Sequence, residues 1–377
     1  MRQSFDRRTL LLGAIGAAGA AVVAACSHDK PQAAPASPSP SATPTPSPTP
    51  SDPRPRWPLT GRVMKNPADG KHTAVAVKVP DNKNEHPQVG LDKADIVFVE
   101  LDGYRDSSGY SSTRLVPVFH SRLPDGVGPV RSIRPVDIAL LSPIGAVIGN
   151  TGATGWVLNY VKHFARFIDG SRSYMATKGT GSYSIDPNRV RTYQGVTYYD
   201  RAVVCHPKQL AKQTKKFRGG PPHLYLPFAT AVDEVSTDKG KPARTIHVPW
   251  KQGHTYDMGY TYDKKSGTYL RSMPWGPHVL ADGTRVAPDN VLVIRAKQHY
   301  AKIFHGSGHD EPIHDIVNAK GTFAYFHGGK YVAGTWKKGP VNGLFSFTLS
   351  DGTPLKMAPG QTYVELPQSN AKVLVKA

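Results

Sequence analysis

A run of prolines between residues 27 and 56 limits where this chain can fold. The segment reads SHDKPQAAPASPSPSATPTPSPTPSDPRPR, with a proline every two to four residues and no apolar period. Such a segment cannot bury enough apolar surface to offset the conformational entropy of folding. Proline-rich chains extend by roughly 3 Å per residue, so about 30 residues reach on the order of 80–90 Å. We therefore predict an extended stalk, with the folded part beginning near residue 57.

The residues before the stalk predict export and lipid attachment. A basic start is followed by an apolar stretch rich in glycine and alanine, which ends in Val23-Ala24-Ala25-Cys26. This stretch is too short for a comfortable membrane span and is typical of a signal peptide. Its end is similar to a bacterial lipobox, whose cysteine receives a lipid such as palmitate. Arg7-Arg8 is similar to a twin-arginine export signal, with an ordinary Sec signal as the alternative. We predict a signal peptide over 1–26 and a lipid anchor on Cys26.

The cysteines and the net charge bound the chemistry further. Cys26 and Cys205 are the only two cysteines in the sequence, so acylation of the first leaves the second without a disulfide partner. We expect a buried apolar thiol at Cys205; a catalytic thiol with His206 is the alternative. The formal net charge is +19, which attracts polyanions. Envelope polymers are the expected partners, with no specific nucleic acid, and a solubilising surface charge is the alternative.

Hydrophobic patterning predicts strands at 73–79, 94–101 and 113–120, and helices at 135–141 and 155–167. The run ADIVFVEL at 94–101 is apolar on both faces, which is typical of a central strand. The proline in TRLVPVFH, at 113–120, indicates a sheet edge or a bulge.

From about residue 245 the sequence changes to short alternating runs. Turn dipeptides separate several of them: Asp282-Gly283, Gly328-Gly329 and Asp351-Gly352. This pattern predicts antiparallel hairpins. Because strands and helices come first and a β region second, we predict an α+β fold. Its parts are a mixed α/β subdomain at 57–244 and a β-rich subdomain at 245–377. Since no proline-rich linker separates them, we expect the two parts to pack together.

The segment GPVRSIRP, residues 128–135, displays arginines on a stiff loop between a strand and a helix. The glycine and the prolines restrict the backbone, and a preoriented guanidinium can contact an anion through two donors. We predict an anion site formed by Arg131, Ser132 and Arg134, with Arg114 on the preceding strand. Internal pairing of these arginines with Glu100 or Asp95 is the alternative.

Several other side chains are candidates for catalysis. Asp81 and Glu100 lie at strand ends, where ligands often bind, and His120 ends the next strand. His223, in PPHLY, is held by two prolines, and His86, in NEHPQVG, belongs to the loop that follows Asp81. A local Asx turn at Asp81 and surface positions for the histidines are the alternatives.

The sequence HGSGHDEPIHD holds the densest histidine cluster, with His305, His309 and His314. Its spacing matches no zinc motif, and its glycines and proline favour a solvated loop. The chain also lacks a glycine-rich phosphate loop, a GxSxG elbow and an SxxK motif. We therefore predict no metal site and no cofactor.

Three segments together resemble the N-terminal region of the YerB-like bacterial lipoproteins: DNKNEHPQVGLDKADIVFVE, STRLVPVFHS and GPVRSIRPVD. GPHVLADGTRVAPDNVLV and SDGTPLKMAPGQTYVELP resemble the C-terminal region of the same family. The resemblance spans about residues 70–370. It implies an exported lipoprotein and supplies no activity.

The sequence thus supports three hypotheses. The first is a lipid-anchored protein on the outer face of the membrane that binds an anionic wall polymer or peptidoglycan through Arg114, Arg131 and Arg134. The second is a hydrolase or transferase of envelope polymers that uses a carboxylate with a histidine. The third is a structural lipoprotein with no ligand. The sequence carries no signal for a particular oligomeric state.

Overall fold

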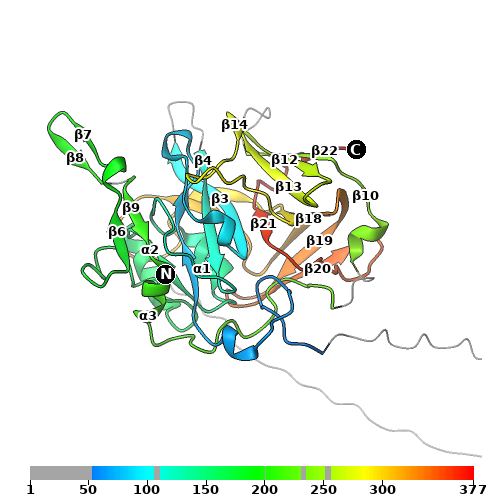
Figure 1. Ribbon diagram of the computed structural model, residues 1–377, viewed down its shortest axis with the longest axis horizontal. Helices are drawn as coiled ribbons and strands as arrows, with labels where there is room; N and C mark the ends of the chain where they lie inside the picture. Colours follow the sequence, from blue (N-terminus) through cyan, green and yellow to red (C-terminus); the bar gives the residue numbers. More distant parts are fainter. Residues whose placement is uncertain (1–52, 106–110, 200, 231–234, 251–255) are drawn as a thin grey trace, which may run out of the picture. The chain divides into compact units, whose positions relative to one another are not determined.

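Strands from both halves of the sequence form one large mixed sheet (Figure 1). The computed structural model describes residues 53–377 except 106–110, 200, 231–234 and 251–255. The predictions for the signal peptide, for Cys26 and for nearly all of the stalk therefore lie outside the described residues.

Among the described residues the large sheet has eleven strands in the order β10-β19-β18-β15-β21-β3-β4-β1-β5, with β2 beside β4 and β20 beside β19. Their bounds are β1 Ala74–Val77, β2 Val79–Pro80, β3 Ile96–Arg105, β4 Ser111–Phe119, β5 Ala146–Gly149, β10 Lys241–Pro242, β15 Asn290–Ile294, β18 Ala319–His327, β19 Lys330–Lys338, β20 Phe345–Leu349 and β21 Thr362–Glu365.

A second sheet in the described chain has five strands in the order β14-β13-β12-β11-β22. Their bounds are β11 Thr245–Pro249, β12 Asp257–Asp263, β13 Thr268–Met273, β14 Gly276–Pro277 and β22 Leu374–Lys376. Three strand pairs lie outside both sheets: β6 Tyr183–Ile185 with β9 Val203–Cys205, β7 Arg191–Tyr193 with β8 Val196–Tyr198, and β16 Gln298–Ala301 with β17 Glu311–His314. The α-helices are α1 Pro135–Leu141, α2 Gly155–His163 and α3 Pro207–Lys212.

The large sheet is covered on both faces. Along β3, Phe98 packs in a core with α1 and α2, whereas Val97 and Val99 pack in a second core with residues of the five-stranded sheet such as Tyr260. Alternate side chains of a strand point to opposite faces, so a strand buried on both sides must be apolar throughout. β3 lies between β21 and β4, which confirms the predicted central strand.

The α+β prediction is confirmed: the described chain holds few helices, and its sheets are mostly antiparallel. The second predicted helix ends at His163 instead of residue 167, because the chain turns there and the amide of Asp169 donates to the carbonyl of Ala146 in β5 over 2.9 Å. Pro117 lies inside the sheet, not at an edge, because β4 has a neighbour on each side. One neighbour is β3; the other is formed by β1 and β2, which lie before and after Lys78 in the chain.

The predicted hairpin at Gly328-Gly329 joins β18 to β19, and both glycines have positive φ values, 61° and 74°. This is the backbone that a two-residue hairpin turn requires. The division at residues 244 and 245 stays a prediction. β21, from the later part, pairs in parallel with β3, from the earlier part, within one sheet.

Candidate functional site

The arginine loop is held by backbone hydrogen bonds on two sides. The amide of Arg131 donates to the carbonyl of Lys78 over 2.8 Å, and the amide of Ile133 donates to the carbonyl of Gly152 over 2.9 Å. The side chain of Ile133 is fully buried. The loop then enters α1, where Asp137 accepts from the amide of Arg134 over 2.7 Å and caps the helix. These hydrogen bonds therefore fix the backbone of Arg131 and Arg134, from which the two side chains extend.

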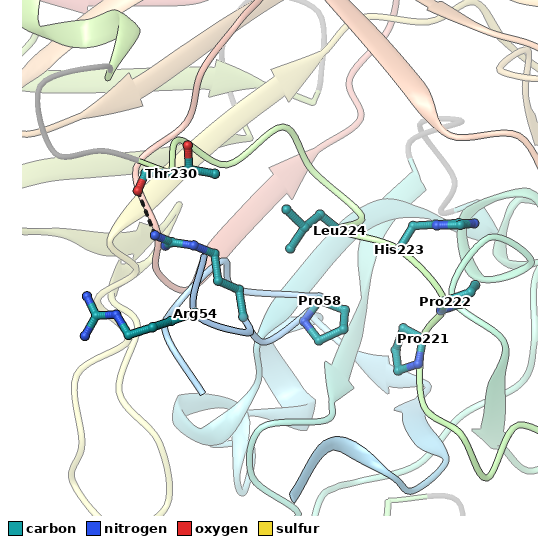
Figure 2. A pocket seen from close by; sticks show the side chains of 8 residues that line it. Arg54, Pro58, Pro221, Pro222, His223, Leu224 and Thr230 are labelled. Atoms are coloured by element: carbon teal, nitrogen blue, oxygen red, sulfur yellow. Dashed lines mark hydrogen bonds between the residues drawn. The ribbon is translucent and has the colours of Figure 1, made fainter. Parts of the chain in front are cut away.

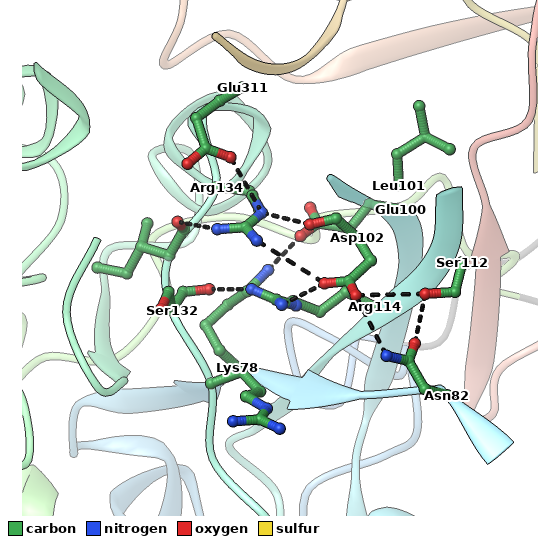
Figure 3. A network of polar contacts seen from close by, with 12 residues as sticks. Lys78, Asn82, Glu100, Leu101, Asp102, Ser112, Arg114, Ser132, Arg134 and Glu311 are labelled. Carbon is green, nitrogen blue, oxygen red and sulfur yellow. Dashed lines mark hydrogen bonds and ion pairs between the residues drawn. The ribbon is translucent and has the colours of Figure 1, made fainter. Parts of the chain in front are cut away.

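Arg114 and Arg134 meet at the carboxylate of Asp102, near the end of β3 (Figure 3). Arg114 Nη2 contacts Asp102 Oδ1, and Arg114 Nη1 donates to the carbonyl of Ser132 over 2.9 Å. Arg134 Nε donates to the carbonyl of Asp102 over 2.6 Å and lies 3.4 Å from Glu311 Oε2. Burial, together with nearby Arg134, lowers the pKa of Arg114 to about 10. Both guanidinium groups thus have internal partners.

A buried lysine sits under the same cluster. Lys78 Nζ contacts Glu100 Oε1 and donates to Asp137 Oδ1 over 2.7 Å, and all three side chains are fully buried. Burial, and then the neighbouring Asp137, raise the pKa of Glu100 to about 8. A protonated Glu100 leaves one lysine beside one carboxylate, which avoids an unbalanced charge in the core. The ion pair of Glu100 is therefore with Lys78, and Arg114, one of the arginines that the sequence suggested, acts on it as a nearby charge.

Arg131 points to a different carboxylate. Its Nε donates to Glu85 Oε2 over 3.0 Å and its Nη2 contacts Glu85 Oε1, which makes a two-point contact. The side chain of Arg131 is 18% exposed, against 7% for Arg114 and 12% for Arg134. Arg131 is thus the most accessible of the three predicted arginines.

The remaining predicted residues lie in other surroundings. Asp95 accepts from the amides of His120 and Ser121 over 2.6 and 2.7 Å. His120 Nε2 lies 2.9 Å from the carbonyl of Gly70, and burial, with nearby His72, lowers the pKa of His120 to about 4. Both residues therefore have local structural contacts, and neither contacts the arginine loop.

His223 is exposed and lines a pocket of about 330 Å³ (Figure 2). The other lining residues are Arg54, Arg56, Pro58, Pro221, Pro222, Leu224 and Thr230. Arg56 donates to the carbonyl of Thr230 over 2.8 Å. None of the predicted anion-binding residues lines this pocket, so the sequence candidates fall in separate places.

Asp81 belongs to a second buried cluster, together with a histidine of its own loop. Its Oδ1 lies 3.2 Å from His86 Nε2, and its Oδ2 accepts from Thr113 over 2.9 Å and from Arg271 Nη2 over 2.8 Å. Burial alone would raise the pKa of Asp81, but Arg271 and His86 hold it well below its usual value. Asp81 is therefore an ionised carboxylate with a partner on each oxygen.

His278 completes this cluster. Its Nδ1 accepts from Arg271 Nη1 over 2.7 Å, and its Nε2 donates to Gln88 Oε1 over 2.9 Å. Burial, and then Arg271, lower the pKa of His278 well below its usual value, so the ring is neutral. These contacts join the loop after β2 to β13.

Asp81, His86 and His278 each place a possible metal-ligand atom within 4.8 Å of the others. However, the guanidinium of Arg271 already donates to Asp81 and to His278. A cation would either have to displace this guanidinium or lie beside it, which would bring two positive charges together. The donor set fits a hydrogen-bonded network better than a metal centre.

Sequence reasoning did not single out Lys78, Asp102 or Arg271. A signal was present for two of them. Lys78 interrupts the apolar run TAVAVKV, and Arg271 lies on the same face of β13 as the buried Tyr269 and Met273. A charge at a core-facing position requires a partner, so this pattern can locate a buried ion pair.

The fold and these clusters define an α+β protein whose charged side chains near the sheet ends are largely paired with one another. Residues 59–217 match the N-terminal domain, and residues 246–364 the C-terminal domain, of a family described as "Protein of unknown function (DUF3048)". The chain belongs to this family.

The chain is also 26% identical over 326 residues to "Putative lipoprotein YerB" of Bacillus subtilis (strain 168), a match that covers 82% of this chain and 88% of that protein. The crystal structure of the YerB protein from Bacillus subtilis matches with a TM-score of 0.66 at 23% identity, over 85% of this chain and 100% of that chain. This likeness shows the fold. Across the residues that the structure describes, no helix is both long enough and apolar enough to span a membrane.

Proposed function

We propose that this protein is a lipoprotein, anchored by Cys26 on the outer face of the cell membrane, whose folded part binds an anionic component of the cell envelope. The lipobox-like Val23-Ala24-Ala25-Cys26 and the name of the Bacillus relative support the anchor. An extended stalk, as the sequence predicts for residues 27–56, would give the folded part the reach to meet wall polymers. The net charge of +19 favours anionic partners.

The two-point contact between Arg131 and Glu85 carries the binding proposal. A carboxylate or phosphate of a ligand presents the same pair of oxygens as Glu85, so it can replace Glu85 at the guanidinium without moving Arg131. Glu85 lies on a single 3-10 turn, Lys83–Glu85. Rotation of the Glu85 side chain would leave the backbone of this turn in place, because Arg189 holds it at the carbonyl of Glu85.

A second arginine borders this contact. Arg189 donates to the carbonyl of Glu85 over 3.3 Å and also contacts the carbonyl of Pro87. Arg189 also forms an ion pair with Asp186, whose Oδ2 lies 3.6 Å from Arg189 Nε, and a ligand anion would add to this contact. Arg131 and Arg189 are therefore the groups that we expect a ligand to contact.

Arg114, Ser132 and Arg134 act through Arg131 in this proposal. The contacts of Arg114 with Asp102 and with the carbonyl of Ser132 fix the loop that carries Arg131. Arg134 fixes the same loop through Asp102. They are positioning residues.

Binding of the full chain, in detergent, to inorganic polyphosphate and to wall-polymer fragments tests this function. Arg131→Lys should weaken binding by about tenfold to a hundredfold, because lysine lacks the planar fork. Its melting temperature should stay close to that of the parent. Arg134→Lys should instead lower the melting temperature. Arg166→Ala removes one exposed arginine elsewhere and should change binding little. The site would be excluded if Arg131→Lys bound the polymers with the affinity of the parent, or if it lost no more affinity than Arg166→Ala.

The pair of Asp81 and His86 supports a second function, hydrolysis or transfer on envelope polymers. Asp81 is ionised and fully buried, while the His86 side chain is 11% exposed and packs edge-on against Trp275 at 5.1 Å between ring centroids. A carboxylate that holds one ring nitrogen leaves the other to act as a general base. Release of soluble fragments from purified cell walls, lost in His86→Ala, would support it. Equal release by parent and variant would not.

A further inference from the structure

The hairpin of β7 and β8 projects from the folded part (Figure 1). Its side chains Tyr193 and Tyr198 are exposed. Its strands pair as Arg191 with Tyr198, Thr192 with Thr197, and Tyr193 with Val196. Gln194 and Gly195 form the turn, with φ values of 49° and 78°. Every residue from 191 to 199 is exposed.

Cross-strand partners point to the same face of a hairpin, and neighbours along a strand point to opposite faces. One face therefore carries Arg191, Tyr193, Val196 and Tyr198, which we call the tyrosine face. The opposite face carries Thr192 and Thr197, whose hydroxyl oxygens lie 3.3 Å apart. The sequence thus places every large side chain of the two strands on one side.

The exposure of the tyrosine face has no structural explanation within the described chain. Tyr193 is 65% exposed, Val196 52% and Tyr198 44%. An isolated two-stranded hairpin has little stability of its own, and these side chains add no core to it. Large exposed apolar groups gathered on one face mark interaction sites. The tyrosine face is therefore a candidate contact surface.

The base of the hairpin joins the surface that we propose for anion binding. Arg189, just before β7, donates to the carbonyl of Glu85, and Arg201, after β8, donates to the carbonyl of Asn84 over 3.3 Å. Glu85 is the partner of Arg131. A ligand bound at Arg131 can thus extend along the hairpin.

We propose that the tyrosine face binds sugar rings, so that the ligand is an anionic polysaccharide: a sugar polymer that carries carboxylate or phosphate groups. This inference rests on the proposed function and names its ligand class. Tyrosine rings are rigid, lose little conformational entropy on binding and pack against the C–H faces of sugar rings. Arg191, on the same face, contacts a charged group of the polymer. The arginines at the base of the hairpin would thus recognise the charged groups of the polymer, and the tyrosine face would recognise its sugar rings.

A lipid surface is a less suitable partner for the hairpin of β7 and β8 than a polysaccharide. A hairpin enters a membrane with its tip, and here the tip is Gln194-Gly195. Interfacial segments combine aromatic side chains with large aliphatic ones. Residues 191–199, RTYQGVTYY, contain only one aliphatic side chain, Val196, and no tryptophan, phenylalanine or leucine. The composition favours hydroxyl-rich, ring-containing partners.

The experiment compares the binding of two polyanions, one built of sugar rings and one without rings. The full chain in detergent is titrated with polygalacturonate, a carboxylated sugar polymer, and with inorganic polyphosphate, which has no rings. Tyr193→Ala with Tyr198→Ala should weaken polygalacturonate binding by about tenfold, since a ring contact contributes roughly three- to tenfold in affinity. Polyphosphate binding should stay within about twofold. Phenylalanine at both positions should retain binding, and Thr192→Ala with Thr197→Ala is the matched control.

Each other outcome overturns the inference. Equal losses for both polymers, or no loss for either, remove the role of the rings. Tyrosine-dependent binding of the Cys26→Ala chain to anionic phospholipid vesicles would assign the face to lipid, and tyrosine-dependent dimerisation would assign it to a second copy. Loss of all polyanion binding in Arg131→Lys, with the tyrosine variants unaffected, would keep the proposed function and reject only this extension.

Discussion

Arg271 donates to Asp81 over 2.8 Å across a separation of 190 residues in the sequence. Both side chains are fully buried. Arg271 belongs to β13 of the five-stranded sheet, and Asp81 follows β2 at the large sheet. One ion pair therefore connects the two sheets, and the sequence does not indicate that Asp81 is the partner of Arg271. Removing either partner leaves an uncompensated charge in the interior.

We predict that Arg271→Met destabilises the fold by about 3–5 kcal/mol, because Asp81 then stays buried without its main cation. The free energy of unfolding from urea titration measures this loss. Adding Asp81→Asn to the variant should restore part of it, since the remaining charge is removed. A double variant whose loss equals the sum of the two single losses would show that the pair is not coupled.

Glu100 gives a prediction about pH. Its pKa is raised to about 8 in the folded protein by burial and by Asp137, whereas an unfolded glutamate titrates near about 4.3. Between these values the folded state holds a proton that the unfolded state has lost, so this group's contribution to stability falls as pH rises from about 5 to 8. Glu100→Gln removes that dependence.

Unfolding midpoints of the parent and of Glu100→Gln should therefore converge near pH 5 and separate toward pH 8, where the variant is the more stable. The difference between the two chains isolates Glu100, because His120 and the other groups titrate in both. Parallel curves across this range would show that Glu100 is already ionised in the folded state.

Cys26 gives a prediction about location. Acylation at the lipobox-like segment should hold the parent chain in the membrane fraction, and Cys26→Ala should release it or leave an unprocessed precursor. Fractionation followed by gel migration measures both. If the variant fractionates and migrates like the parent, the anchor lies elsewhere.

The stalk gives a prediction about proteolysis. Limited digestion with a protease of broad specificity should cut first within residues 27–56 and leave residues 57–377 intact. The segment near Lys241 should resist, because Lys241 and Pro242 form β10 and pair with Tyr331 and Lys330 of β19. A dominant early cut there, giving two stable halves, would show independently folded domains.

Patterns that depend on near neighbours in the chain were readable from the sequence. The run that is apolar on both faces predicted β3 as a central strand, and the helix predicted at 135–141 has the bounds of α1. The same holds for the turn at Gly328-Gly329. Local backbone preference and side-chain period decide these features, and both are written in consecutive residues.

The partners of the charged residues were decided by the tertiary structure. The sequence places Arg131 and Arg134 on a restricted loop, but it does not distinguish Glu85 and Asp102 from Glu100 and Asp95 as their partners. That choice depends on which strand ends the sheet brings together, and β21 lies between β15 and β3 only in the folded chain. A buried charge pairs with whatever the fold places within about 4 Å, and so its role follows from topology rather than from its own sequence neighbours.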